Sequence, residues 1–307
     1  QRVMIAMALA GGPDLLVADE PTSALDPDTT QEILSLLARL KQERGMAMLV
    51  ISHDLDFAAT ADRVAVISSG RIIETGPAAE VLSAPREAYT RRLVVARGML
   101  RTPRPVAEAG AAPILAAAHD LTIDYPGRHF FAKPVRVLER VSISLRAGRT
   151  LGILGQSGSG KTTLALALAG MREPSAGSVE LLGTRLRPGA GALPRADRRA
   201  VQLVFQNPQG ALNPRLTVAG ALAEPLRLGG QDQGVSAAIG LALEEVGLRS
   251  SLAERFPHQL SGGQRQRVCI ARALLCDPKV LICDEVVSAL DMTAQAEILA
   301  LLVRLQQ

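Results

Sequence analysis

Short, continuously apolar runs recur along the chain, and several are followed by a stretch with helical periodicity. Residues 151–154 precede a glycine-rich turn and a helical pattern over 162–169, while residues 279–283 follow Pro278 and end at two carboxylates. A continuously apolar run of strand length is typical of a strand that is buried on both faces of a parallel sheet. This pattern predicts an α/β fold whose core is a mostly parallel sheet.

Other parts of the chain are rich either in predicted strands or in predicted helices. Short β runs at 118–124 and 136–145 lead toward the glycine-rich turn, and helical patterns follow it at 216–227 and 236–246. The first hundred residues also contain a β-rich part, with strands predicted at 46–51, 63–67 and 71–74 and a turn at Ser69 and Gly70.

The glycine-rich turn carries the first candidate chemistry. Between a strand and a helix, such a turn directs backbone N–H groups toward one point that suits a phosphate. Lys161 supplies a cation for the β- and γ-phosphates, and we assign the hydroxyl of Thr162, rather than that of Thr163, to Mg²⁺. The sequence thus predicts ATP and Mg²⁺ as cofactors, bound by Gly155, Gln156, Ser157, Gly158, Ser159, Gly160, Lys161, Thr162 and Thr163.

Asp284 and Glu285 follow the apolar run 279–283 directly. Carboxylates at the end of a parallel strand lie at the edge where such sheets bind ligands. Asp284 would hold Mg²⁺, directly or through water, and Glu285 would polarise the water that attacks the γ-phosphate. A solvated surface pair is the ordinary alternative, but the phosphate-binding turn in the same domain argues against it.

Two parts of the chain repeat one another. Residues 1–42 and 266–307 match at one constant offset with more than half of their positions identical, and Asp19-Glu20 corresponds to Asp284-Glu285. So long a period suits two tandem copies of one globular domain. The repeat therefore predicts a second site, with Asp19 at the metal and Glu20 as a catalytic residue.

With Leu-Ser-Gly-Gly-Gln at residues 260–264, these motifs resemble those of ATP-binding-cassette (ABC) transporter ATPases. The resemblance implies a P-loop NTPase with a RecA-like core, an antiparallel β subdomain and a helical signature subdomain, in two tandem copies that are both truncated. Ser261, Gly262, Gly263 and Gln264 would be the signature that caps the γ-phosphate of an ATP held by the opposite domain. A serine and glycines before a helix also form a backbone anion cradle and an ordinary N-cap.

The resemblance assigns three more residues. Gln206 matches a glutamine that contacts Mg²⁺ in the catalytic site and couples it to a membrane partner. His53 matches the switch histidine that contacts the γ-phosphate. Tyr125 stands where the family places an aromatic ring under adenine, and a core tyrosine explains this residue equally well.

A break in the pattern separates the two copies. Residues 101–113 contain prolines and small residues without periodicity, which is typical of a linker. We expect residues 1–100 to be the C-terminal half of a first nucleotide-binding domain, and residues 114–307 to be a second one without its last strands and switch histidine. The chain would then be a fragment of a fused subunit, with neither composite ATP site complete.

Composition narrows the class of protein. The chain is 48% apolar, and no apolar run approaches the roughly 20 residues of a membrane-spanning helix. The net charge is +4, the arginines are scattered along the chain, and only 2% of residues are aromatic. We therefore expect a solvated basic surface and no nucleic-acid partner. Core thiols are expected, because no metal-binding spacing joins Cys269, Cys276 and Cys283.

Within the ABC family, residues 70–77 and 205–215 resemble ATPase subunits of importers for oligopeptides, dipeptides and nickel. The resemblance implies a peripheral ATPase at the cytoplasmic face of the inner membrane, with dimerising nucleotide-binding domains. It would energise import through permease subunits that receive solute from a binding protein. The alternatives are an exporter ATPase and a non-transport ABC ATPase, and the latter would need charged inserts or a coiled coil that this sequence lacks.

Overall fold

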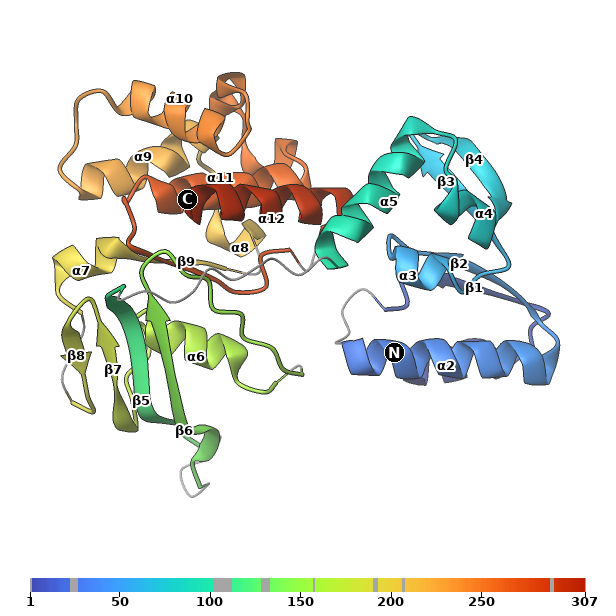
Figure 1. The fold of residues 1–307 in the computed structure, drawn as a ribbon, viewed down its shortest axis with the longest axis horizontal. Coiled ribbons are helices and arrows are strands. Elements are labelled where there is room, and N and C mark those ends of the chain that lie inside the picture. Colours follow the sequence, from blue (N-terminus) through green and yellow to red (C-terminus); the bar gives the residue numbers. More distant parts are fainter. Residues whose placement is uncertain are drawn as a thin grey trace. The chain divides into compact units, whose positions relative to one another are not determined.

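The computed structural model describes residues 2–22, 27–101, 112–127, 133–156, 158–189, 193–205, 208–287 and 290–306. The chain forms two compact units (Figure 1). Unit 1 comprises Gln1–Val106 and Leu290–Leu299, and unit 2 comprises Ala107–Ala289 and Ala300–Gln307. Most of the linker predicted at 101–113 lies outside the described residues.

Unit 1 is built around two parallel strands, β1 (Leu15–Asp19) and β2 (Ala47–Ile51), which pair along their whole length. Helices α1 (Arg2–Leu9) and α2 (Pro27–Arg44) supply most of the core on one face of this pair. The buried side chains of that core are Ile5, Leu9, Leu16, Ile33, Leu37 and Met46. The strand predicted at 46–51 is confirmed.

The other face of the β1–β2 pair is apolar and exposed. Leu15, Val17, Leu49 and Ile51 alternate with the inward-facing positions, and each keeps at least half of its accessible surface, with Ile51 the least exposed at 50%. Strands that are apolar on both faces normally lie in sheets covered on both sides. Within the described part of unit 1, this face lacks such a cover.

The rest of unit 1 is a hairpin and short helices. β3 (Arg63–Ser68) and β4 (Arg71–Pro77) are antiparallel, and Ser69 and Gly70 form the turn with φ of 49° and 74°. The hairpin predicted at this place is confirmed. The helices of this part are α3 (Leu55–Ala58), α4 (Ala78–Ser83) and α5 (Ala88–Arg101).

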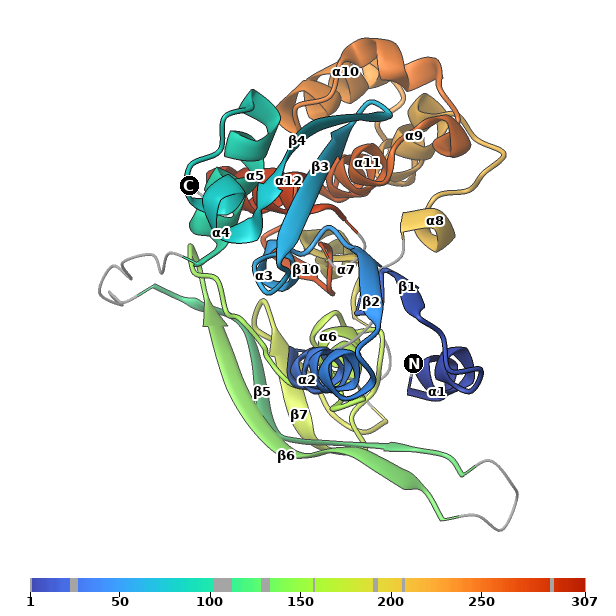
Figure 2. The same ribbon diagram turned by 90° about the vertical axis from the view of Figure 1, so that its right-hand side faces the viewer.

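Unit 2 contains a four-stranded antiparallel sheet in the order β6-β5-β7-β8, of which Figure 2 shows β6, β5 and β7. Its strands are β5 (Ile114–Tyr125), β6 (Val135–Arg146), β7 (Ala176–Leu181) and β8 (Thr184–Leu186). Helix α6 (Lys161–Leu168) packs on this sheet, and the shared core also receives the first residues of two parallel strands, β9 (Val201–Val204) and β10 (Val280–Cys283). The antiparallel β subdomain expected from the family is therefore present.

The segment between β9 and β10 is helical. It contains α8 (Pro208–Ala211), α9 (Val218–Leu228), α10 (Val235–Glu245) and α11 (Gly262–Leu274), with 3-10 turns η1 (Ser250–Glu254) and η2 (Pro257–Gln259). Helix α7 (Arg195–Ala200) precedes β9, and α12 (Met292–Gln306) follows β10. Thr217 caps α9 by accepting the N–H of Gly220. The helices predicted at 216–227 and 236–246 are confirmed to within a few residues.

The strand predicted at residues 151–154 is wrong. These residues form no strand, and Leu151, Ile153 and Leu154 are 43%, 38% and 96% exposed. A strand needs a neighbour for its ladder of hydrogen bonds, and residues 151–154 pair with no described strand, since β9 and β10 pair only with one another. Among the described residues, parallel pairing is therefore limited to two separate two-stranded sheets, β1–β2 and β9–β10, in place of the extended parallel sheet that the sequence predicted.

Cys269 gives the fold a pH dependence. The residue is 3% exposed in α11, and burial raises the pKa of its thiol to about 11. The folded state binds this proton more tightly than the unfolded state, so the resulting stability is fully present below the unfolded pKa of ~8.5 and is lost as pH rises through about 11.

We therefore expect the free energy of unfolding in urea to fall between pH 8 and pH 11. Cys269→Ala removes this contribution, so the difference between the unmodified chain and the variant should shrink by ~2–3 kcal/mol over that range. A difference that stays constant with pH would contradict the assignment.

Candidate nucleotide-binding site

The phosphate loop enters α6 through two glycines with left-handed backbone. Gly158 has φ of 79°, and Gly160, the N-cap of α6, has φ of 96°. The helix begins at Lys161, so its first backbone N–H groups face the loop, as phosphate binding at a helix N-terminus requires. Ser157 lies outside the described residues, and its predicted role stays a prediction.

Lys161 joins the loop to the carboxylates after β10. Its ammonium donates hydrogen bonds to the carbonyl oxygens of Gly155 and Gln156, at 2.8 and 2.9 Å, and lies 3.7 Å from Oε1 of Glu285. Loop, helix start and strand end therefore meet at one cation.

Asp284 and Glu285 differ in exposure and backbone shape. Asp284 is 8% exposed, and its N–H donates to the carbonyl of Val204 in the neighbouring strand β9. Glu285 has φ of 47°, a left-handed conformation that is uncommon for a residue with a side chain, and its side chain is 40% exposed. The turn thus keeps the aspartate inside the site and leaves the glutamate accessible.

The residues assigned to Mg²⁺ fit that ion. Thr162 is exposed at the start of α6, and Asp284 supplies a largely buried carboxylate. Mg²⁺ in nucleotide sites is bound by one or two protein oxygens, with phosphates and water as the other ligands. In the described residues no cluster of three or more His, Cys, Asp or Glu side chains occurs.

Unit 1 repeats part of this geometry. Glu20 has φ of 46°, almost the value of its counterpart Glu285. Its Oε1 lies 2.8 Å from Nδ1 of His53 and also accepts the backbone N–H of His53 at 3.2 Å. Asp19 is exposed at the end of β1. The structure thus brings Glu20 and His53 together, as the resemblance implied.

The signature residues form the start of α11. Ser261 accepts the N–H of Gln264, and the side chain of Gln264 accepts the N–H of Ser261 in return, a reciprocal capping box. Gly262 and Gly263 form the first turn of the helix. Both readings of Ser261, as a cap and as part of an anion cradle, remain compatible with this geometry.

Two further residues were assigned to the site from the sequence. Gln206 lies outside the described residues, so its predicted role is not tested. Tyr125 ends β5, and its hydroxyl lies 3.4 Å from Oγ1 of Thr163, the residue after Thr162 in α6. Sequence reasoning missed Arg172, whose guanidinium lies over the Tyr125 ring, because no local pattern links residues so far apart.

The fold and this site define a P-loop ATP-binding cassette, and comparison with known proteins agrees. Residues 138–288 match the sequence profile of the family described as "ABC transporter". Over these residues the chain is similar to the ATP-binding cassette of the ABC transporter family. In none of its described helices are length and apolar character together sufficient to cross a membrane.

Particular relatives cover the whole chain. It is 42% identical to the peptidoglycan transport ATP-binding protein YejF of Agrobacterium fabrum, over 316 aligned residues that cover 57% of that protein. It is 39% identical to the glutathione import ATP-binding protein GsiA of Escherichia coli, over 54% of its length. The chain thus spans a little over half the length of these curated relatives.

Solved structures give the same fold. A dimeric bacterial ABC transporter cassette, MJ0796, is 28% identical with a TM-score of 0.53, and the match covers 62% of this chain and 82% of that one. A second structure of MJ0796, a dimeric post-hydrolysis state bound to ADP and Pi, has a TM-score of 0.52 over 83% of its chain.

Three glycine substitutions test the loop's backbone. At Gly160, a Cβ would lie 2.8 Å from Cδ2 of Leu138 and 3.1 Å from the carbonyl of Val137, in addition to the strain of its positive φ. At Gly158 only the φ is unfavourable, and at Gly152 an added Cβ would meet nothing within 4 Å.

We expect Gly160→Ala to lower the free energy of unfolding by ~2–4 kcal/mol, Gly158→Ala by ~1–2 kcal/mol, and the control Gly152→Ala by less than ~0.5 kcal/mol. Urea denaturation followed by circular dichroism measures all three. Equal effects at Gly152 and Gly160 would show that the loop does not adopt this conformation.

Proposed function

We propose that the chain binds ATP with Mg²⁺ and hydrolyses it to drive the import of peptides through a membrane permease. The observation that carries this proposal is the convergence of the phosphate loop and Glu285 on the ammonium of Lys161. A triphosphate would take the place of the loop carbonyls as the partner of this cation, since phosphate oxygens carry full charge.

The chemistry follows from the residues around that cation. Mg²⁺, held by Asp284, Thr162 and Gln206, would neutralise charge on the β- and γ-phosphates. Glu285 accepts the proton of the attacking water, while the bond between the γ-phosphorus and the bridging oxygen breaks and leaves ADP. The exposure of the Glu285 carboxylate allows water to reach it.

A second nucleotide-binding domain would complete each site. The signature at Ser261–Gln264 offers backbone N–H groups and the dipole of α11 to a γ-phosphate held elsewhere. Glu20 and His53 would serve the other composite site, where His53 senses the γ-phosphate from its place beside Glu20. The structural neighbours are dimeric ATP-binding cassettes, which supports this arrangement.

Transport of small peptides is supported by the relatives. YejF is described as a peptidoglycan transport protein and GsiA as a glutathione import protein, and both substrates contain peptide. We infer that this chain works at the cytoplasmic face of the membrane with permease subunits and a solute-binding protein. Oligopeptides, dipeptides and nickel remain within the proposed substrate range.

The repeat supports two tandem cassettes, the first represented by residues 1–100 and the second by 114–307. At the offset of the repeat, Leu15 and Val17 correspond to Val280 and Ile282. In unit 2 the latter pack against α6, β5 and β7, and Val280 is only 2% exposed. Leu15 and Val17 are each more than half exposed. We infer that a half-cassette like residues 114–205 covers them in a longer polypeptide, for which the relatives have the length.

Two substitutions test the ATPase proposal. Lys161→Ala should weaken Mg-ATP binding by ~10- to 100-fold, because a charge-assisted contact to phosphate is lost. Glu285→Gln should retain binding and lower steady-state hydrolysis by ~10²- to 10⁴-fold, because the group that accepts the water's proton is lost. Isothermal calorimetry and phosphate release measure the two effects in the complete gene product.

Matched controls are available in unit 2. Glu180 is 41% exposed and lies 3.6 Å from His119, much like Glu285 beside its own cation, and Glu180→Gln should leave hydrolysis unchanged. Lys133→Ala removes a lysine remote from the loop in sequence. Unaltered ATP affinity in Lys161→Ala would refute the site.

The tandem proposal predicts two bound nucleotides per complete polypeptide. Glu20→Gln should then reduce hydrolysis alongside Glu285→Gln, while Glu43→Gln, which alters a surface pair with Arg39, should not. One nucleotide per polypeptide, with hydrolysis insensitive to Glu20→Gln, would exclude a second functional cassette.

A further inference from the structure

Arg172 covers one face of the Tyr125 ring. The central carbon of its guanidinium lies 4.1 Å from the ring centroid, and Nη2 donates a hydrogen bond to the carbonyl oxygen of Asp124 at 3.1 Å. The ring's hydroxyl lies 3.4 Å from Oγ1 of Thr163. One cation therefore contacts the aromatic residue and the backbone beside it, while the hydroxyl reaches the helix that starts at the phosphate loop.

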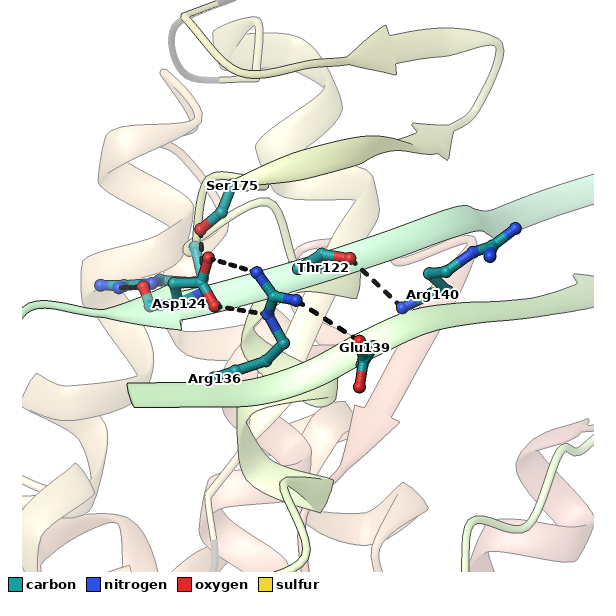
Figure 3. Close-up of polar contacts among 7 residues, drawn as sticks. Thr122, Asp124, Arg136, Glu139, Arg140 and Ser175 are labelled. Carbon is teal, nitrogen blue, oxygen red and sulfur yellow. Dashed lines mark hydrogen bonds and ion pairs between the residues drawn. The ribbon is translucent and has the colours of Figure 1, made fainter. Parts of the chain in front are cut away.

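Asp124 is itself fixed on three sides (Figure 3). Its N–H donates to Oγ of Ser175 at 2.8 Å, and its carboxylate accepts Nε of Arg136 at 3.0 Å. Arg136 also lies 3.4 Å from Glu139, and these carboxylates raise the pKa of its guanidinium. The end of β5 is thus anchored to β6 and to the turn before β7, so the carbonyl that holds Arg172 does not move independently.

This arrangement has a consequence for stacking. An aromatic ring has two faces, and a cation held over one of them leaves the other for a second planar group. A ring held in one orientation also loses less conformational freedom when such a group arrives. Tyr125 packs in part against the core and is only half-buried, so the residue is not closed off from a ligand.

We propose that Arg172 is a positioning residue for the purine base of the nucleotide, acting through Tyr125. This inference rests on the proposed function, in which Tyr125 lies under adenine. Arg172 holds the ring from behind, and its effect is confined to ligands that carry a base.

A purely structural role is the competing explanation. In that case the hydrogen bond to Asp124 would hold the turn after α6, and its loss would lower the affinity for every ligand of the phosphate loop equally. Three substitutions separate the two: Arg172→Ala removes cation and hydrogen bond, Arg172→Gln keeps a donor for the carbonyl without a cation, and Arg172→Lys keeps a cation.

The test compares Mg-ATP with Mg-tripolyphosphate, which has no base, by calorimetry on the complete gene product. Arg172→Ala and Arg172→Gln should weaken ATP binding by ~3- to 30-fold, the range expected for a cation–π contact, and change tripolyphosphate binding by less than ~2-fold. Arg172→Lys should restore part of the loss. Arg92→Ala removes the guanidinium that lies 5.6 Å from the centroid of the Tyr89 ring in unit 1, and it should change the affinity for neither ligand.

Tyrosine fluorescence in the 307-residue chain gives an independent measurement. This chain has two tyrosines and no tryptophan, so Tyr89→Phe leaves Tyr125 as the sole reporter. ATP should quench its emission, tripolyphosphate should not, and Arg172→Gln should reduce the quenching at equal occupancy. Free tyrosine at the same ATP concentration corrects for absorption by the base.

The outcomes are distinct. Equal losses for both ligands, or unchanged ATP affinity in Arg172→Ala and Arg172→Gln, would overturn the role of Arg172. Should Tyr125→Ala leave ATP affinity unchanged, the base-stacking part of the proposed function fails. Should Lys161→Ala leave tripolyphosphate affinity unchanged, the phosphate site itself fails.

Discussion

The ammonium of Lys161 is the contact on which the site in unit 2 depends. It donates hydrogen bonds to two carbonyls of its own loop and forms an ion pair, at 3.7 Å, with the carboxylate of Glu285. The lysine is the first residue of α6 and the glutamate follows β10, so one side chain connects a helix start to a strand end. Gly158 and Gly160 make this possible, because their left-handed backbone brings the loop back over the lysine.

The repeat within the chain acts as an internal control on this geometry. Glu20 and Glu285 share the same uncommon backbone conformation, although one is held by a histidine and the other by a lysine. The conformation therefore belongs to the strand-to-turn junction, and the partner of the carboxylate varies. The exposure of the two strands also differs: β10 begins inside a covered core, while Leu15 and Val17 of β1 are exposed to solvent.

Local patterns predicted most of the elements and the chemistry of the loop. The helix after the phosphate loop, the hairpin at Ser69 and Gly70, and the N-terminus of α11 depend on nearby residues, and the structure has them where the sequence placed them. The prediction of a strand at residues 151–154 was wrong because a parallel strand forms only beside a neighbouring strand, and a short window of sequence does not contain that neighbour. Arg172 was missed for a related reason, since its contact with Tyr125 joins distant parts of the chain.

The pairing of the strands also sets an order of assembly. In the antiparallel sheet, β7 and β8 pair at Leu181 and Thr184 across a tight turn, so little chain entropy is lost when they meet. In the parallel pair, Val201 lies opposite Val280, with the whole helical segment closed into a loop between them. Long loops of this kind close slowly, because their entropy is lost before the contacts form. The β7–β8 hairpin therefore closes over a short loop, whereas the carboxylates after β10 reach Lys161 only when this long loop has closed.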